Sequence, residues 1–322
     1  MHRILQALGV AGLASVLAMS APLAEAKDVT LGYSSVGLSY PFAAAIAKGF
    51  QDAATAAGVK AVVLDAKGNV EKQANDIDDL IAQKVDGIAI MPLDSTVAQG
   101  WVDRAASHDI PTVAVASEIG DPHKRPIKQV YEKLSALVTQ DEVTAGEQAG
   151  AMAAKMLPPG KTAKIAIIEG SAGYAEVTQR TQGFKAGLDK AGVKYQIVAS
   201  QPGDWTSEKA ESTCQNILAS NPDIDLFFNQ SDDMVVGCGL AVRAAGSNAK
   251  LIGMGGSRLA INAIKTGDVA GTVCYKPEEI GHLAFKALYG AVTKKNTTKA
   301  AFVAYDTPPV TKANLQSCVP QW

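Results

Sequence analysis

The chain has 322 residues, which is too many for one ordinary hydrophobic core and fits two domains. It contains 30 Lys and Arg residues against 32 Asp and Glu residues. This balance gives no indication of a nucleic acid or another polyanion as a partner.

The chain begins with a segment typical of a secretory signal peptide. His2 and Arg3 give a basic start, residues 4–21 are apolar, and Ala24-Glu25-Ala26 follows the small-x-small pattern of a cleavage site. The apolar stretch is also long enough for a transmembrane anchor, although no second apolar run follows it. We therefore expect residues 1–26 to be removed on export.

After Lys27, short apolar runs alternate with Ala-rich amphipathic runs. The apolar runs are bounded by Gly, Pro, Asp or Asn, as strands buried on both faces are. The predicted strands are Val29–Tyr33, Ala61–Leu64, Gly87–Met91, Thr112–Ala116, Lys164–Ile168, Tyr195–Ala199, Leu226–Phe228, Leu251–Met254 and Val269–Cys274. Predicted helices include Pro41–Ala57, Val70–Gln83, Ala145–Met156, Ala175–Ala191 and Ser207–Ser220. This alternation predicts an α/β fold with parallel strands and helices on both faces.

One pattern occurs twice along the chain. Gly49-Phe50 is followed by Ala57-Gly58, and Gly183-Phe184 is followed at the same spacing by Ala191-Gly192. In each copy the second glycine can end a helix in the left-handed conformation before the next strand. The repeat predicts two lobes of the same design, the second starting near Asp141.

The predicted ligand contacts follow from this architecture. Ligands of open parallel sheets bind beyond the carboxyl ends of the strands, and two facing lobes would close around one cleft. Residues just after the predicted strands are Ser35, Tyr40, Phe42, Ser117, Glu118, Arg180, Trp205, Ser231, Asp232, Gly255 and Tyr275. Their aromatic faces and hydroxyls suit a sugar or polyol. Arg180 can bind vicinal hydroxyls or a carboxylate, and an acid such as Glu118 can pair with an amine.

The same residues have ordinary structural interpretations, such as lobe packing for the aromatics and a helix N-cap for Asp232. Enzyme patterns are incomplete. Gly170-Ser171-Ala172-Gly173 lacks the spacing of a nucleophile elbow, and Arg258 stands where a dinucleotide fingerprint needs its third glycine. We therefore expect no catalytic residue, cofactor or metal.

Six segments carry a family resemblance: Tyr40-Pro41-Phe42, Ile110-Pro111, Arg180-x-x-Gly183-Phe184, Ala199–Trp205, Asp232-Asp233-Met234 and Lys276–Gly281. The chain is similar to the periplasmic type I sugar-binding proteins, in particular the ribose-binding group, over nearly all of its mature length. The resemblance implies two Rossmann-like (flavodoxin-like) lobes joined by three hinge crossings. Their expected bounds are residues 27–138 with 277–303, and residues 139–276 with 304–322.

In function, the resemblance implies a monomeric periplasmic protein that is not an enzyme and binds no nucleic acid. It would capture a small polar ligand and deliver it to the inner-membrane permease subunits of an ABC importer. A periplasmic sensor subunit of the same fold is the alternative function.

The resemblance also assigns roles in the cleft. Phe42 and Trp205 would stack on the ligand, and Arg180 would bind its hydroxyls. The chain departs from the ribose-type pattern at four places. Ala116-Ser117 follows the fourth strand, and Gly255 lies in the glycine loop, residues 253–257. Ser231 precedes Asp232, and Tyr275 lies at the hinge. Small or aromatic groups thus replace charged ones, which argues against ribose. A sugar or polyol is expected, with an aromatic, carboxylate or amine ligand as the alternative, and residues 119–133 are expected to reach over the cleft.

Four cysteines remain in the mature chain, and four cysteines allow three pairings. In a flavodoxin-like lobe the helices that carry Cys214 and Cys238 lie side by side, so these two can form a disulfide. The resemblance places the segment around Cys318 near the hinge, which pairs it with Cys274. The alternative is buried free thiols.

Overall fold

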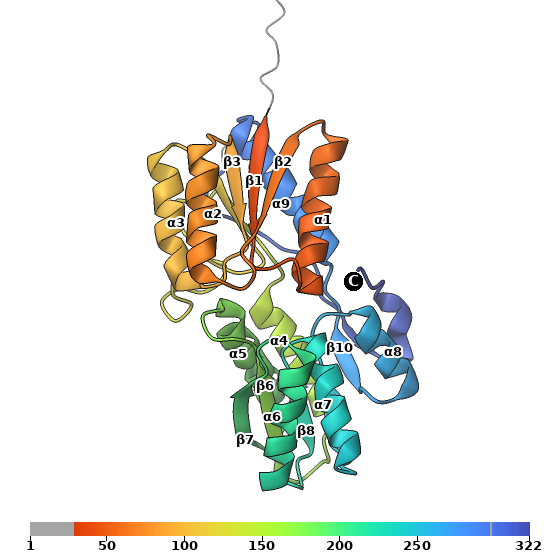
Figure 1. The fold of residues 1–322 in the computed structure, drawn as a ribbon. Coiled ribbons are helices and arrows are strands. Elements are labelled where there is room, and N and C mark those ends of the chain that lie inside the picture. Colours follow the sequence, from red (N-terminus) through yellow and green to blue (C-terminus); the bar gives the residue numbers. More distant parts are fainter. Residues whose placement is uncertain (1–28, 297) are drawn as a thin grey trace, which may run out of the picture.

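The structure is a computed structural model that describes residues 29–296 and 298–322, and the predicted signal peptide lies outside them. The described residues form two lobes, each built on a six-stranded sheet with helices on both faces (Figure 1). The strand orders are β11-β5-β4-β3-β1-β2 in the first lobe and β12-β10-β9-β8-β6-β7 in the second. The strands are parallel except for β12, which pairs antiparallel with β10.

The first lobe contains β1 (Thr30–Ser35), α1 (Pro41–Ala56), β2 (Lys60–Asp65), α2 (Val70–Ala82), β3 (Gly87–Ile90), α3 (Ser95–Ser107), β4 (Thr112–Val115), β5 (Ala136–Val138), α9 (Pro277–Val292) and β11 (Ala301–Val303). The second contains α4 (Glu142–Ala154), β6 (Ala163–Glu169), α5 (Ala175–Lys190), β7 (Tyr195–Pro202), α6 (Ser207–Ser220), β8 (Leu226–Asn229), α7 (Asp232–Ala244), β9 (Lys250–Ile252), α8 (Arg258–Thr266), β10 (Gly271–Val273), β12 (Pro309–Thr311) and the 3₁₀ helix η1 (Lys312–Ser317). The chain therefore passes between the lobes after β5, after β10 and after β11.

The repeated Gly-Phe pattern is explained by the way helices pack in each lobe. A Cβ atom on Gly49 would lie 2.1 Å from the Glu278 carbonyl oxygen of α9, and one on Gly183 would lie 2.0 Å from the Val143 carbonyl oxygen of α4. Only glycine therefore allows α1 to lie against α9 and α5 against α4 this closely. The predicted left-handed caps are confirmed at Gly58 and Gly192, with φ of 67° and 70°.

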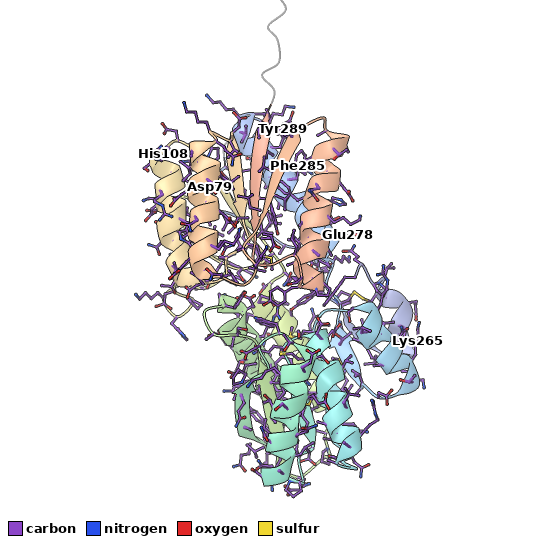
Figure 2. All side chains as sticks on the ribbon, in the orientation of Figure 1. Asp79, His108, Lys265, Glu278, Phe285 and Tyr289 are labelled. Atoms are coloured by element: carbon purple, nitrogen blue, oxygen red, sulfur yellow. A yellow bond between two sulfur atoms is a disulfide. The ribbon has the colours of Figure 1, made fainter. Side chains whose placement is uncertain are left out.

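The phenylalanine of each pattern fills the core beneath its helix. Phe50 packs on Tyr33 with ring centroids 5.2 Å apart, and edge-on against Phe285 of α9. Phe184 stacks on Phe228 at 4.1 Å. Figure 2 shows Phe285 among the side chains of the first lobe. These aromatic contacts fix helix against sheet on corresponding faces of the two lobes.

Residues 119–133 do not reach over the cleft, so that prediction is wrong. Ile119 and Ile127 are buried in the core that contains Trp101 of α3. The Tyr131 hydroxyl donates to Asp103 of α3 at 2.6 Å. The segment packs on α3 of the first lobe through its apolar residues, and Lys128 pairs with Asp141 at the start of α4 at 2.8 Å.

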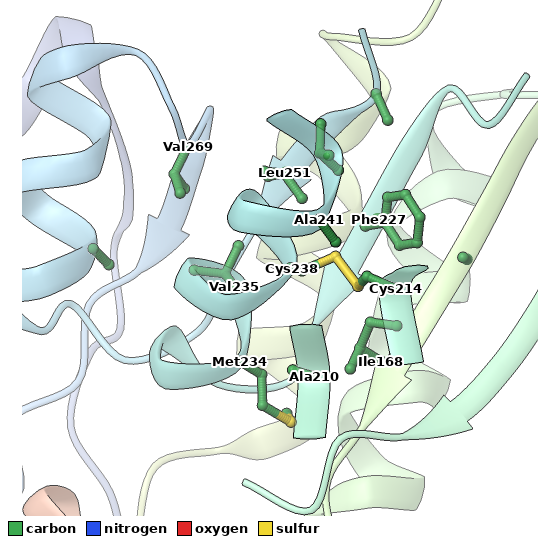
Figure 3. Close-up of a cluster of buried hydrophobic side chains, with 14 of the residues drawn as sticks. Ile168, Ala210, Cys214, Phe227, Met234, Val235, Cys238, Ala241, Leu251 and Val269 are labelled. Atoms are coloured by element: carbon green, nitrogen blue, oxygen red, sulfur yellow. A yellow bond between two sulfur atoms is a disulfide. The ribbon is translucent and has the colours of Figure 1, made fainter. Parts of the chain in front are cut away.

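All four cysteines are bonded. Cys214 of α6 and Cys238 of α7 join two helices inside the core of the second lobe, with Cα atoms 5.4 Å apart (Figure 3). Cys274 follows β10 and is joined to Cys318, which follows η1, with a Cα separation of 5.7 Å. Among the residues described here, no helix is both long enough and apolar enough to cross a membrane.

Thiol counting on denatured, unreduced protein is expected to find no reactive thiol. Replacing Cys214 and Cys238 by alanine should lower the free energy of unfolding by about 3 kcal/mol, because the unfolded chain loses a cross-link. Urea denaturation of the double variant measures this. Two or four reactive thiols in the parent protein would contradict the bonded state.

Candidate ligand-binding cleft

A cavity of about 490 Å³ lies between the two lobes. Residues of the first lobe line one side, among them Tyr40 and Phe42, and residues of the second lobe line the other. The predicted contacts that line it are Tyr40, Phe42, Arg180, Trp205, Ser231, Gly255 and Tyr275. The structure therefore brings most of the predicted set into one cavity.

Helix starts surround this cavity. Tyr40, Tyr174, Thr206 and Ser231 are the N-cap residues of α1, α5, α6 and α7, and all four line it. In a parallel sheet with helical connections, the helices that follow the strands begin at the carboxyl edge. The parallel order of both sheets thus explains why these residues meet.

Two of the predicted contacts lie outside the lining because they hold the backbone of their own lobe. Ser35 is fully buried, and its hydroxyl accepts from the Gly37 amide at 3.4 Å. The Asp232 carboxylate accepts from the Ser257 amide at 2.7 Å and from the Thr272 hydroxyl at 2.6 Å. Burial raises the pKa of Asp232 to about 6. Asp232 therefore positions the glycine loop rather than a ligand.

Ser117 and Glu118 also lie outside the lining, where they take part in a contact between the lobes. The Ser117 hydroxyl lies 2.5 Å from a carboxylate oxygen of Glu176 in α5. Nearby, the Ser95 amide donates to the Gly173 carbonyl at 3.0 Å. The lobes thus touch along one side of the cleft. Ser117 therefore takes part in packing of the lobes, and no local pattern in the sequence indicates this contact.

Glu118 is buried at this contact. Its residue is 5% exposed, and one of its carboxylate oxygens has no hydrogen-bond partner among the described residues. The pKa of Glu118 is raised to about 7, chiefly by burial and also by nearby Glu176 and Asp121, while Arg125 acts in the opposite direction. An ionised Glu118 therefore opposes this packing of the lobes.

The charge of Arg180 is neutralised by Glu142, a residue that the sequence analysis missed. Arg180 Nε and Nη2 each donate to the Glu142 carboxylate at 2.7 Å, and Nη1 donates to the Gln230 carbonyl at 2.6 Å. Both side chains are buried. Glu142 stands in the first turn of α4, where an acid is commonly explained by the helix dipole, so its sequence position gave no signal.

This ion pair is connected to all three hinge crossings. At the first, Gln140 donates to Glu142 at 2.5 Å. At the second, the Tyr275 hydroxyl donates to Glu142 at 2.7 Å. The Tyr305 hydroxyl of the third crossing donates to Gln140 at 3.3 Å and accepts from the Lys276 amide at 2.9 Å. Arg180 therefore joins the cavity to the segments that connect the lobes.

Aromatic rings form much of the cavity wall. The Arg180 guanidinium lies 5.5 Å from the ring centre of Trp205 and 5.2 Å from that of Tyr275. Tyr174 contacts Trp205 edge-on at 5.6 Å. Trp322, which the sequence analysis also missed, contacts Phe42 edge-on at 5.5 Å. The indole N–H groups of Trp205 and Trp322 are buried and have no acceptor among the described residues.

The cavity is lined by more acidic than basic side chains. Glu176, Glu208 and Asp233 line it together with Arg180, whose charge Glu142 offsets. Burial raises the pKa of Glu176 and that of Asp233. No group of three or more His, Cys, Asp or Glu side chains within the described residues is arranged to hold a metal. The arrangement disfavours an anion, and its aromatic rings and carboxylate oxygens suit a ligand with an apolar face and hydrogen-bond donors such as hydroxyls.

Comparison with known proteins gives a family for this chain. Residues 31–296 match the family model described as a periplasmic binding protein domain. The chain belongs to the periplasmic binding protein family. Its curated relatives include the ribose import binding protein RbsB of Bacillus subtilis, which is 34% identical over 263 residues that cover 81% of each chain. The D-allose-binding periplasmic protein of Escherichia coli is 31% identical over 258 residues, 79% of this chain and 81% of that protein.

Solved structures of periplasmic binding proteins have the same fold. The Caulobacter myo-inositol binding protein, bound to myo-inositol, superimposes with a TM-score of 0.81 at 26% identity. The match covers 92% of this chain and 98% of that one. The expected two-lobed α/β fold is thereby confirmed.

Substitution of Arg180 by alanine should lower the free energy of unfolding of this periplasmic binding protein by about 3–5 kcal/mol, because Glu142 would be left buried and unpaired. The Arg180→Met, Glu142→Gln double variant should recover most of that loss. Urea denaturation without ligand measures both. The exposed Lys190–Glu147 pair provides the control, where Lys190→Ala should cost less than about 1 kcal/mol. Equal losses of unfolding free energy for Arg180→Ala and Lys190→Ala would contradict the assignment of Arg180 and Glu142 as a buried ion pair.

Glu118 gives a pH dependence with a defined sign. Its pKa in the folded protein lies above its ordinary value of 4.5, so the folded state holds more protons and its stability falls as pH rises from about 4.5 to about 7. Glu118→Gln should therefore stabilise the protein by about 1–3 kcal/mol at pH 8 and have little effect at pH 4.5. Urea denaturation at both pH values tests this. The exposed Glu132→Gln variant is the control, and an equal effect of Glu118→Gln at the two pH values would refute the prediction.

Proposed function

We propose that this protein captures a neutral sugar or polyol in the cleft and delivers it to the permease subunits of an ABC importer. The observation that carries the proposal is the cavity between the lobes, with its aromatic walls and a charge-neutralised arginine. Its volume of about 490 Å³ is in the range of sites for small molecules. Relatives named for ribose import and for binding D-allose support the ligand class.

The chemistry of the wall fits such a ligand. A sugar or polyol ring presents C–H groups that pack on the faces of rings such as Phe42 and Trp205. Its hydroxyls can accept from Arg180, whose guanidinium has five N–H groups, three of which donate to Glu142 and Gln230. Carboxylates such as Asp233 accept from further hydroxyls. An anionic ligand would meet these carboxylates without a free opposing charge.

The cellular setting is part of the proposal. The periplasmic names of the relatives and the signal-peptide pattern of residues 1–26 support export to the periplasm with cleavage of that segment. There the protein would act as a monomer, with the permease as its protein partner. Nothing in this role requires a cofactor or a nucleic acid.

A thermal-shift panel tests the ligand class. D-ribose, D-allose, xylitol and myo-inositol are compared with acidic counterparts such as xylonate. A neutral member present at a hundred times its Kd should add about 2.7 kcal/mol of stability, and its acidic counterpart should add much less. Trp205→Ala should weaken binding of that member by about 1–3 kcal/mol through lost apolar contact.

The control is Tyr289→Ala, which removes an aromatic ring of α9 far from the cavity (Figure 2). It should leave binding unchanged. Preferential stabilisation by the acidic members would refute a neutral ligand, and equal binding by parent and Trp205→Ala would place the ligand elsewhere.

A further inference from the structure

Trp322 forms a wall of the cleft that neither strand order nor the repeated pattern of the lobes predicts. It lines the cavity and contacts Phe42 of the opposite lobe. Its ring also fills the space beside Gly255, because a Cβ atom there would lie 2.8 Å from Trp322 Cζ2. The position of this ring therefore sets how much of the cleft is open next to the glycine loop.

The segment that carries Trp322 has little packing of its own. Val319 is 77% exposed. The Trp322 carbonyl accepts from the Arg258 amide at the start of α8, and the Gln321 side chain accepts from the Glu278 amide at the start of α9, each at 2.9 Å. Figure 1 shows this end of the chain between the lobes, beside the start of α1. Two hydrogen bonds to exposed helix starts are a weak anchor for a large ring.

The covalent anchor is the disulfide between Cys274 and Cys318. Cys318 is four residues before Trp322, and Cys274 is adjacent to Tyr275 of the cavity wall. A Cβ atom on Gly256 would lie 2.6 Å from Cys318 Sγ, so the bond lies directly against the glycine loop. The disulfide thus fixes residues 318–322 to the same part of the hinge that lines the cavity.

We propose that Trp322 is a specificity-determining residue that limits the size of the ligand, and that the Cys274–Cys318 disulfide holds it in place. The inference rests on the proposed function, because it takes the cavity as the ligand site. It assigns different roles to the two disulfides. Cys214–Cys238 joins α6 to α7 inside the second lobe, whereas Cys274 is adjacent to Tyr275 and Cys318 lies four residues before Trp322, and both of these aromatic residues line the cavity.

The Cys214–Cys238 disulfide provides a matched control for the anchoring role of Cys274–Cys318. Hydrogen–deuterium exchange without ligand compares the Cys274→Ala, Cys318→Ala variant with the Cys214→Ala, Cys238→Ala variant. Loss of the first bond should speed exchange of the Arg258 and Glu278 amides by at least about tenfold, because their acceptors move away. Loss of the Cys214–Cys238 bond should leave the exchange rates of those amides as they are in the parent protein. Equal rates in both variants would overturn the anchoring role.

Ligand selection is tested with both disulfides intact. Trp322→Ala and Trp322→Phe are screened by thermal shift and calorimetry against glycerol, xylitol, myo-inositol, D-allose and sucrose. Trp322→Ala should weaken binding of the members that the parent binds by roughly tenfold to a hundredfold and should newly bind or better bind larger members. Trp322→Phe should keep the parent's order of preference.

The outcomes separate the two proposals. If the parent binds members of the panel and Trp322→Ala keeps the same order of preference, the inference is overturned and the proposed function stands. If neither binds any member, the sugar or polyol class and the inference both fail. A uniform loss of affinity without a change in the preferred size also overturns the inference, because it indicates only general damage to the cleft.

Discussion

The buried pair of Glu142 and Arg180 is the interaction on which the organisation of this molecule depends. Two charges taken out of water are tolerated only when opposite charge and further hydrogen bonds surround them. Here Gln140, Tyr275 and the Gln230 carbonyl supply those bonds. These partners come from two hinge crossings and from the strand end of β8. The requirement to satisfy one buried ion pair therefore fixes the hinge, the second lobe and the cavity wall relative to one another.

The pair also decides which ligands the cavity can hold. Without Glu142, Arg180 would present an unpaired positive charge that could bind a carboxylate or a phosphate. With Glu142 present, Arg180 still directs N–H groups into the cavity but brings no net charge to it. A ligand that hydrogen-bonds to Arg180 also contacts the network that joins the hinge segments, so binding and lobe movement share the same residues. Ligand binding can thereby be coupled directly to closure of the two lobes.

The sequence alone was sufficient for the fold and for seven of the residues that line the cavity. Apolar runs bounded by turn residues predicted nine of the twelve strands in the described residues, and the Gly-Phe repeat predicted two lobes, because both patterns are local. Strands β5, β11 and β12 were not predicted. Each has three residues and is defined by the neighbour it pairs with rather than by its own pattern.

The differences between the predicted contacts and the cavity lining have a similar cause. Ser117, Glu118 and Asp232 do follow strands, as predicted, but their partners come from distant residues such as Glu176 and Thr272. Glu142 and Trp322 were missed for the same reason, since nothing next to them in sequence indicates the cavity. The position of a residue just after a strand predicts that it lies at the carboxyl edge of the sheet. It does not predict which way a side chain at that edge turns.

The division of the first lobe between two distant parts of the chain has a consequence for the order of assembly. Its core includes Ile280, Ala284 and Phe285 of α9, and β11 completes its sheet beside β5. The core between α4, α5 and the second sheet consists of residues 145–275, which are continuous in the chain. Contacts between nearby residues form with less loss of chain entropy than distant ones. This core of the second lobe can thus form from one uninterrupted segment, to which β12 and η1 are added later, whereas the core of the first lobe stays incomplete until α9 arrives.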